Sequence, residues 1–230
     1  MVIDRMYNSA RELRTSDIRC PYTLIGAKYQ PDNYRIYDIG SLMKSGLRRG
    51  VDVSNFIYDF IGEQGEVLGI SNIVSGRVLM TKFKALNEKK FLTYGPIRQI
   101  PYGLGLFDEN FHYGTPIVLV EGEKDQAGMS MCYPYVCAVG KSSTGVVMKQ
   151  VLLSLTNRFI LYYDADDPGR HACYRDRKFF RDHMCQVDIG IHPPDVKDSG
   201  TIIDYMFQGK EYDAEYIKSF YTLQLMTLTN

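Results

Sequence analysis

The sequence lacks several features that define large classes of protein. No stretch approaches the roughly 18 consecutive apolar residues that a membrane-spanning helix needs, and no signal peptide opens the chain. The five cysteines are odd in number and include no Cys-x-x-Cys pair, which argues against both a disulfide framework and a zinc site. We therefore expect reduced thiols, no zinc, no membrane contact and a cytoplasmic location.

The sequence also lacks a complete P-loop and a histidine metal-binding motif, which limits the kinds of site that it can contain. Gly140-Lys141-Ser142 has the ending of a nucleotide-binding P-loop, but that motif requires a glycine five residues earlier, where this chain has Tyr135. The histidines at positions 171, 183 and 192 share no metal-ligand spacing, and none neighbours a candidate nucleophile. We therefore reject a P-loop and assign no chemistry to these histidines.

A net charge of zero conceals an uneven distribution of charge. Residues 1–115 carry 15 Lys and Arg against 12 Asp and Glu, whereas residues 116–230 carry 12 against 15. The segment 77–98 alone has six basic residues and a single acid, Glu88. Such segregation suits an enzyme that grips phosphates with one part and performs metal chemistry with the other.

The most informative stretch is 116–198, where three short apolar runs each end in acidic residues. The runs 117–120, 159–163 and 187–191 lead into acids at 121–125, 164–167 and 195–198. Short unbroken apolar runs bounded by Gly and Pro are typical of strands buried on both faces of a parallel sheet. With a further strand at 135–139 and helices at 124–133, 145–155 and 169–183, the pattern predicts an α/β fold.

The carboxyl ends of parallel strands lie at one edge of the sheet, which is where such sheets bind their ligands. A group of carboxylates at that edge suits a hard divalent cation, because Mg²⁺ takes oxygen ligands and is usually held by one or two carboxylates plus substrate phosphates. A single Asp in such a place is more often a helix N-cap or a turn residue. Three clusters, one of them Asp164-x-Asp166, together favour a metal site.

The acidic motifs resemble the TOPRIM domain, which DnaG-type primases, topoisomerases and some nucleases share. The matching residues are Glu121 in Glu-Gly-Glu-Lys-Asp, Asp164-x-Asp166 before Pro-Gly-Arg, and Lys197-Asp198. Residues 163–170 are similar to the Tyr-Asp-x-Asp-x-Ala-Gly-Arg signature of the primase branch, with Pro168 in place of the alanine. Upstream, Gly76-Arg77, the Lys-Lys-Phe-Leu-Thr segment 89–93 and Tyr-Gly-Leu at 102–104 resemble parts of primase catalytic cores.

The resemblance implies a TOPRIM Rossmann-like, mostly parallel sheet flanked by helices and preceded by a basic mixed α+β part. Within that part, apolar runs on either side of a Gly-containing turn predict a β-hairpin at 56–70. The implied domains are 1–115, 116–200 and a helical tail 201–230 that packs on the core. Glu121, Asp164 and Asp166 would be catalytic, and together with Asp198 they would bind two or more Mg²⁺ or Mn²⁺ ions. Whether Glu121 is a ligand or a general acid or base stays open. Residues implied to contact template or nucleotide are Arg77, Lys82, Lys84, Lys89, Lys90, Lys124 and Arg170.

The implied function is that of a DNA primase catalytic core, which makes short RNA primers on single-stranded DNA from ribonucleoside triphosphates, here in phage replication in the host cytoplasm. Zinc-binding and helicase domains usual in the family have no counterpart in this sequence, so we expect a zinc-binding module in trans and a replicative helicase as partners. Two alternatives stay open: a TOPRIM nuclease that cuts DNA or RNA with the same metals, and a non-catalytic nucleic-acid-binding replication module. The Gly-Arg and Lys-Lys-Phe-Leu segments, which a nuclease does not need, favour the primase.

Overall fold

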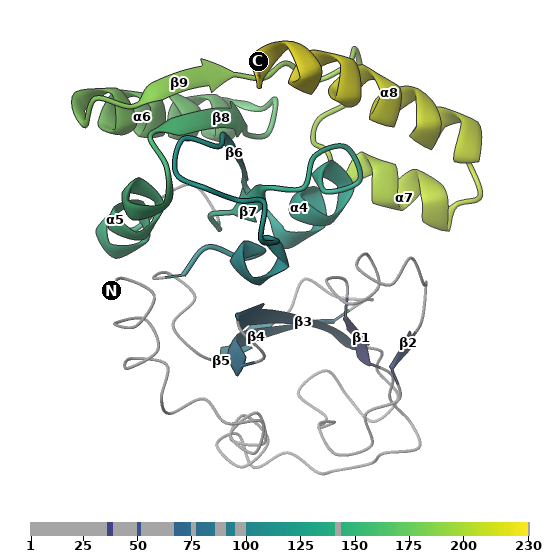
Figure 1. The fold of residues 1–230 in the computed structure, drawn as a ribbon. Helices are drawn as coiled ribbons and strands as arrows, with labels where there is room; N and C mark the ends of the chain where they lie inside the picture. Colours follow the sequence, from purple (N-terminus) through teal and green to yellow (C-terminus); the bar gives the residue numbers. More distant parts are fainter. Residues whose placement is uncertain are drawn as a thin grey trace. The chain divides into compact units, whose positions relative to one another are not determined.

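A boundary between Ile97 and Arg98 divides the chain into two units, Met1–Ile97 and Arg98–Asn230 (Figure 1). The computed structural model describes residues 36–38, 50–51, 67–74, 77–85, 91–94, 100–140 and 144–229. Residues 98–115, which the sequence analysis grouped with the N-terminal part, belong to the second unit. One reason is a pair of backbone hydrogen bonds, each 2.9 Å long, between Tyr102 and Ala138 of the second unit.

The first unit contains a mixed five-stranded sheet with the order β2-β1-β3-β4-β5. Its strands are β1 (Ile36–Asp38), β2 (Gly50–Val51), β3 (Val67–Val74), β4 (Arg77–Ala85) and β5 (Phe91–Tyr94). Only β1 and β3 pair in parallel; the other pairs are antiparallel. The long hairpin is β3–β4, whereas the first strand of the predicted hairpin, 56–61, lies outside the described residues. Three of the predicted phosphate-binding residues, Arg77, Lys82 and Lys84, are in β4, while Lys89 and Lys90 lie outside the described residues.

The second unit is built on a four-stranded, all-parallel sheet with the order β7-β6-β8-β9. Its strands are β6 (Ile117–Val120), β7 (Val136–Ala138), β8 (Arg158–Tyr162) and β9 (Gln186–Ile189). All four β6 residues are buried with 0% exposure, as expected for a central strand with both faces covered. Burial of each of these aliphatic side chains contributes roughly 1.5–3 kcal/mol to folding. The α/β prediction is confirmed.

Five α-helices accompany this sheet: α4 (Glu123–Met129), α5 (Val146–Leu155), α6 (Asp167–Asp182), α7 (Thr201–Phe207) and α8 (Glu211–Leu228). Since parallel strands are joined by right-handed crossovers, the reversal of direction after β7 places α4 on one face of the sheet and α5 and α6 on the other. α7 and α8 lie on the α4 side (Figure 1). The predicted helices 145–155 and 169–183 match α5 and α6, and α4 ends earlier than predicted.

The alternation of side chains along β8 shows how the two helical layers are fixed. Phe159 stacks on Phe180 of α6, with ring centroids 4.2 Å apart. Tyr162 points to the opposite face, where its ring meets Tyr221 of α8 edge-on at 5.6 Å. Successive strand residues face opposite sides of a sheet, so one strand anchors both layers.

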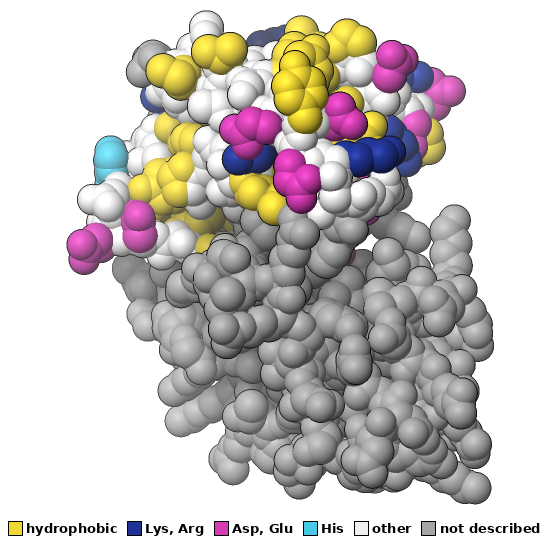
Figure 2. Space-filling model, turned by 90° about the vertical axis from the view of Figure 1, so that its right-hand side faces the viewer, with side chains coloured by type: hydrophobic (Ala, Val, Ile, Leu, Met, Phe, Trp, Pro, Cys, Tyr) yellow, Lys and Arg dark blue, Asp and Glu magenta, His cyan; other side chains and the backbone are white. Residues whose placement is uncertain are grey.

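The helix α8 buries one side and leaves apolar side chains on the other. Residues 214, 217, 221 and 225 are buried, at the spacing of a single helical face. Tyr212, Tyr216 and Leu223 are exposed, and Figure 2 shows hydrophobic side chains among acidic and basic ones on the face of the second unit that carries α7 and α8. No helix in the described part of the chain has the length and apolar character needed to cross a membrane.

Candidate active site at the carboxyl edge of the parallel sheet

The predicted acidic residues meet where β6 and β8, adjacent parallel strands, end. Glu121 follows β6 directly, and Asp164 and Asp166 follow β8. Chain connections leave β6 and β8 in opposite directions, which makes this the switch point where sheets of this type bind ligands. A Cβ atom built on Gly169 would lie 2.8 Å from Glu121 Oε1 and 2.2 Å from the Asp164 carbonyl oxygen. Only glycine permits this close approach of α6 to the carboxylates.

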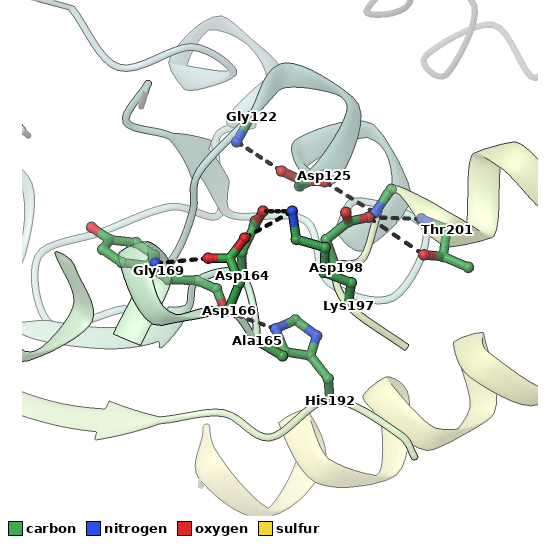
Figure 3. Close-up of polar contacts among 12 residues, drawn as sticks. Gly122, Asp125, Asp164, Ala165, Asp166, Gly169, His192, Lys197, Asp198 and Thr201 are labelled. Carbon is green, nitrogen blue, oxygen red and sulfur yellow. Dashed lines mark hydrogen bonds and ion pairs between the residues drawn. The ribbon is translucent and has the colours of Figure 1, made fainter. Parts of the chain in front are cut away.

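The ammonium of Lys197 lies between two of these carboxylates (Figure 3). Its Nζ is 3.0 Å from Asp164 Oδ2 and 2.9 Å from Asp166 Oδ2. These two contacts raise the pKa of Lys197 above its ordinary value. The loops carrying the three residues are also joined through the backbone, since Ala165 N donates to the Lys197 carbonyl oxygen at 2.9 Å.

Asp166 has two roles that the sequence analysis treated as alternatives. Its Oδ1 accepts a hydrogen bond from Gly169 N at 2.9 Å and caps α6, while Oδ2 faces Lys197. The backbone hydrogen bond from Gly169, followed by the contact with Lys197, holds the pKa of Asp166 below its ordinary value. The N-cap therefore fixes the carboxylate in the site rather than removing it from the site.

A fifth acidic residue, Asp125, joins the loop after β6 to the loop that carries Asp198 (Figure 3). Its Oδ2 accepts from Gly122 N at 2.8 Å, and its Oδ1 accepts from Gly200 N at 3.2 Å. Asp198 Oδ1 in turn accepts from Thr201 N at 3.1 Å. The sequence alone does not distinguish a helix cap from a contact with another loop for Asp125, and in the structure Asp125 makes both. Its spacing after Gly122 signals the cap, but nothing local signals the contact 75 residues away.

Burial and mutual repulsion dominate the electrostatics of the site. Burial, with the negative charges of Asp164 and Asp166, raises the pKa of Glu121 to about 6. Burial and the neighbouring Asp198 and Asp164 likewise raise the pKa of Asp125. Glu121 Oε1 is buried and has no hydrogen-bond partner among the described residues. The site thus holds more negative charge than its own groups neutralise.

The oxygen donors of this site are of the kind that divalent cations prefer. A buried carboxylate oxygen without a partner, surrounded by further hard oxygen donors, is what Mg²⁺ or Mn²⁺ would bind. Within the described residues, however, no group of three or more His, Cys, Asp or Glu side chains is arranged to hold a metal ion as it stands. The donors therefore suit such an ion in kind, although the described side chains are not arranged around one.

A buried network holds the end of β8 from both sides. Towards α6, the Tyr163 hydroxyl donates to Asp176 Oδ2 at 2.6 Å, and Lys149 Nζ lies 2.6 Å from Asp176 Oδ1. Towards α8, His192 Nε2 donates to the Tyr163 carbonyl oxygen at 2.8 Å. A carbonyl only accepts, so Nε2 carries a proton, and Nδ1 lies 2.7 Å from the Tyr221 hydroxyl. The sequence analysis assigned nothing to His192, because its partners are distant in sequence; it positions the residue preceding Asp164.

The predicted binding residues do not all converge on the site. Lys124 Nζ pairs with Asp204 Oδ2 of α7 at 2.6 Å. Arg170 Nη1 donates to the Ala165 carbonyl oxygen at 2.6 Å, and Arg170 also pairs with Asp167 at the exposed start of α6. The structure therefore brings together Glu121 and the acidic residues at 125, 164, 166 and 198, and leaves Lys124 and Arg170 at the margin in ion pairs.

A scan against protein-family models and a search of curated proteins give no significant match. Among solved structures, the chain is similar to a DnaG primase catalytic domain bound to single-stranded DNA, with a TM-score of 0.53 and 18% identity over 99% of this chain and 76% of that one. For the RNA polymerase domain of Mycobacterium tuberculosis DnaG the TM-score is 0.52, with 14% identity over 95% and 81% of the two chains. For the Escherichia coli primase catalytic core the TM-score is 0.51, with 21% identity over 97% and 77%.

In other primase structures that it matches, the chain spans only 39% to 57% of the solved chain. At these identities the likeness concerns the fold. The chain has the fold of primase catalytic cores.

Proposed function

We propose that this chain is the catalytic core of a DnaG-type primase, with a TOPRIM domain in its second unit, and that it synthesises short RNA primers on single-stranded DNA. One observation carries the proposal: in a fold like that of primase cores, Glu121, Asp164 and Asp166 meet at the carboxyl edge of the parallel sheet. Carboxylates that repel one another at such an edge, one of them with a raised pKa, are more typical of functional sites than of structural ones.

The proposed reaction joins a primer 3′-hydroxyl to a ribonucleoside triphosphate. Asp164, Asp166 and Asp198, with Glu121, would hold two or more Mg²⁺ or Mn²⁺ ions, which stabilise charge on the transferring phosphate and lower the pKa of the attacking hydroxyl when bound. The pKa of about 6 at Glu121 also suits it to exchange a proton near neutral pH. The His192 and Asp176 contacts hold Tyr163, and through it Asp164, in place.

The template is proposed to be held by the basic first unit. The similar DnaG catalytic domain was solved with single-stranded DNA. In this chain Arg77, Lys82 and Lys84 lie in β4 and supply positive charge for a phosphate backbone. A replicative helicase, a zinc-binding module, a phage origin and a cytoplasmic location remain part of the proposal.

The same acidic edge would equally serve a metal-dependent nuclease, because cutting and joining phosphodiesters need the same charge stabilisation. We favour the primase because the fold likeness with TM-scores above 0.5 is to primase cores and extends over at least 95% of this chain.

The test is primer synthesis on single-stranded DNA with labelled ribonucleotides and Mg²⁺ or Mn²⁺, beside a nicking assay on the same template. Asp164→Ala should reduce synthesis by roughly 100-fold or more and leave template binding, measured by fluorescence anisotropy, nearly unchanged. The matched control is Asp182→Ala, which removes an exposed carboxylate that pairs with Lys178 on α6.

Metal-dependent nicking without synthesis would replace the primase with a nuclease. Template binding that is unaffected by Asp164→Ala, with neither activity, would leave a non-catalytic binding module.

A further inference from the structure

The Lys197 ammonium lies between Asp164 and Asp166, two of the residues proposed above to hold a metal ion. Its Nζ contacts one oxygen of each carboxylate at 3.0 and 2.9 Å, and it comes from the third acidic loop, next to Asp198. Among the described residues, Asp164 and Asp166 pair with this ammonium, and no group of three or more His, Cys, Asp or Glu side chains is arranged to hold a metal ion. The cation that pairs with Asp164 and Asp166 in this structure is therefore a side chain of the protein itself.

We infer that Lys197 is an internal counter-cation, which a divalent metal must displace from Asp164 and Asp166 before it can bind them. The inference rests on the proposed metal-dependent function and names the group that sets the metal affinity. It explains how Asp164 and Asp166, beside the half-buried Glu121, remain close together without a metal. It also explains why the site has suitable donors but an unsuitable arrangement.

The exposure of Lys197 allows its ammonium to move away from the two carboxylates. The Lys197 side chain is 56% exposed, so it can move into solvent, whereas Asp164 is only 18% exposed and stays in the site. Exposed ion pairs are individually weak, and a divalent ion carries twice the charge of the ammonium. A divalent ion can therefore compete with the ammonium for these two carboxylates.

A purely structural role for Lys197 makes the opposite prediction. If the side chain mainly held the loop of Lys197 and Asp198 against the loop of Asp164 and Asp166, its removal would loosen the site and weaken metal binding. The loops are, however, joined independently by the hydrogen bond from Ala165 N to the Lys197 carbonyl oxygen, which any side chain at this position retains. Removing the ammonium should therefore expose the carboxylates without separating the loops.

The experiment measures Mn²⁺ binding to the full chain by electron paramagnetic resonance, without nucleotide or DNA. Lys197→Met should lower the Mn²⁺ dissociation constant roughly tenfold, because a competing positive charge within hydrogen-bond distance of two ligands is gone. Lys178→Met, which removes an exposed lysine paired with Asp182 on α6, is the charge-matched control and should leave the constant unchanged. Asp164→Ala should raise it.

Thermal unfolding gives a second readout. In EDTA, Lys197→Met should unfold at a lower temperature than the wild type, since its clustered carboxylates lose their counter-charge, and Mn²⁺ should restore more of its stability than it adds to the wild type. Lys197→Gln, which keeps a polar side chain, replaces the Met variant if that variant does not fold. Unchanged or weaker Mn²⁺ binding by a folded Lys197 variant overturns this inference about Lys197 but leaves the proposed metal-dependent function in place. Absence of Mn²⁺ binding in both wild type and variant overturns the metal-dependent function as well.

Discussion

Glu121 carries a half-buried charge that lowers the stability of the folded protein at neutral pH. Its Oε1 is buried without a hydrogen-bond partner among the described residues, and burial together with Asp164 and Asp166 raises its pKa from 4.5 to about 6. A carboxyl whose pKa is higher in the folded state than in the unfolded state favours folding only while it is protonated. Its cost to the folded protein therefore develops as the pH rises from about 4.5 to about 6, and is complete above that range.

Glu121→Gln should accordingly stabilise the metal-free protein at neutral pH. We expect the free energy of unfolding to rise by about 1 kcal/mol at pH 7.5, a value reduced for the partial exposure of the site, and to change little at pH 4. Urea denaturation in EDTA, followed by circular dichroism at both pH values, measures the difference. A gain of equal size at the two pH values would show that titration of Glu121 is not its cause.

At the level of secondary-structure elements, Asp176 of α6 fixes the end of β8. Its carboxylate is buried and receives the hydroxyls of Tyr163 and Thr144, each at 2.6 Å, as well as the ammonium of Lys149 on α5. The Lys149 side chain is 12% exposed, so loss of Asp176 would leave a nearly buried positive charge and two donors without their acceptor.

Asp176→Ala should therefore destabilise the protein by about 3 kcal/mol, because it removes one partner of a buried ion pair and leaves the other partner buried without its counter-charge. Asp182→Ala, six residues along the same helix, removes an exposed partner of Lys178 and should cost less than about 1 kcal/mol. Chemical denaturation of both variants compares the two costs. Equal small losses would mean that α6 does not depend on its buried carboxylate.

At the level of the whole molecule, the second unit contains a complete hydrophobic core. Every strand of the parallel sheet, the helices that cover it and the five acidic residues lie within Arg98–Asn230. Because this core extends from Ile100 to Leu225, we expect the second unit to fold without the first.

The fragment 98–230 should fold cooperatively and bind Mn²⁺ with the dissociation constant of the full chain, yet synthesise no primers, because the basic strands of the first unit are missing. Circular dichroism melting and electron paramagnetic resonance measure the first two properties, and the primer assay measures the third. An unfolded fragment would show that the two units depend on each other for stability.

The sequence by itself determined the parallel α/β sheet and the place of its acidic residues. Unbroken apolar runs such as Ile117–Val120, bounded by Gly and Pro, are typical of strands with both faces covered, and the chain direction puts Glu121 and Asp164 at the same edge. Pattern also predicted α5 and α6, because helical periodicity and end signals are local. The start of α6 was harder to place, because Asp166 is its N-cap and Pro168 lies in its first turn.

Only the tertiary structure decided how these residues meet. Asp125 reaches Gly200, Tyr163 is held by Asp176 and His192, and Lys197 sits between two carboxylates from another loop. Sequence periodicity reports which face of an element is buried, but it contains no information about which distant side chain occupies the facing position. That choice depends on loop paths and on the electrostatic gain from pairing buried charges, and both exist only in the folded chain.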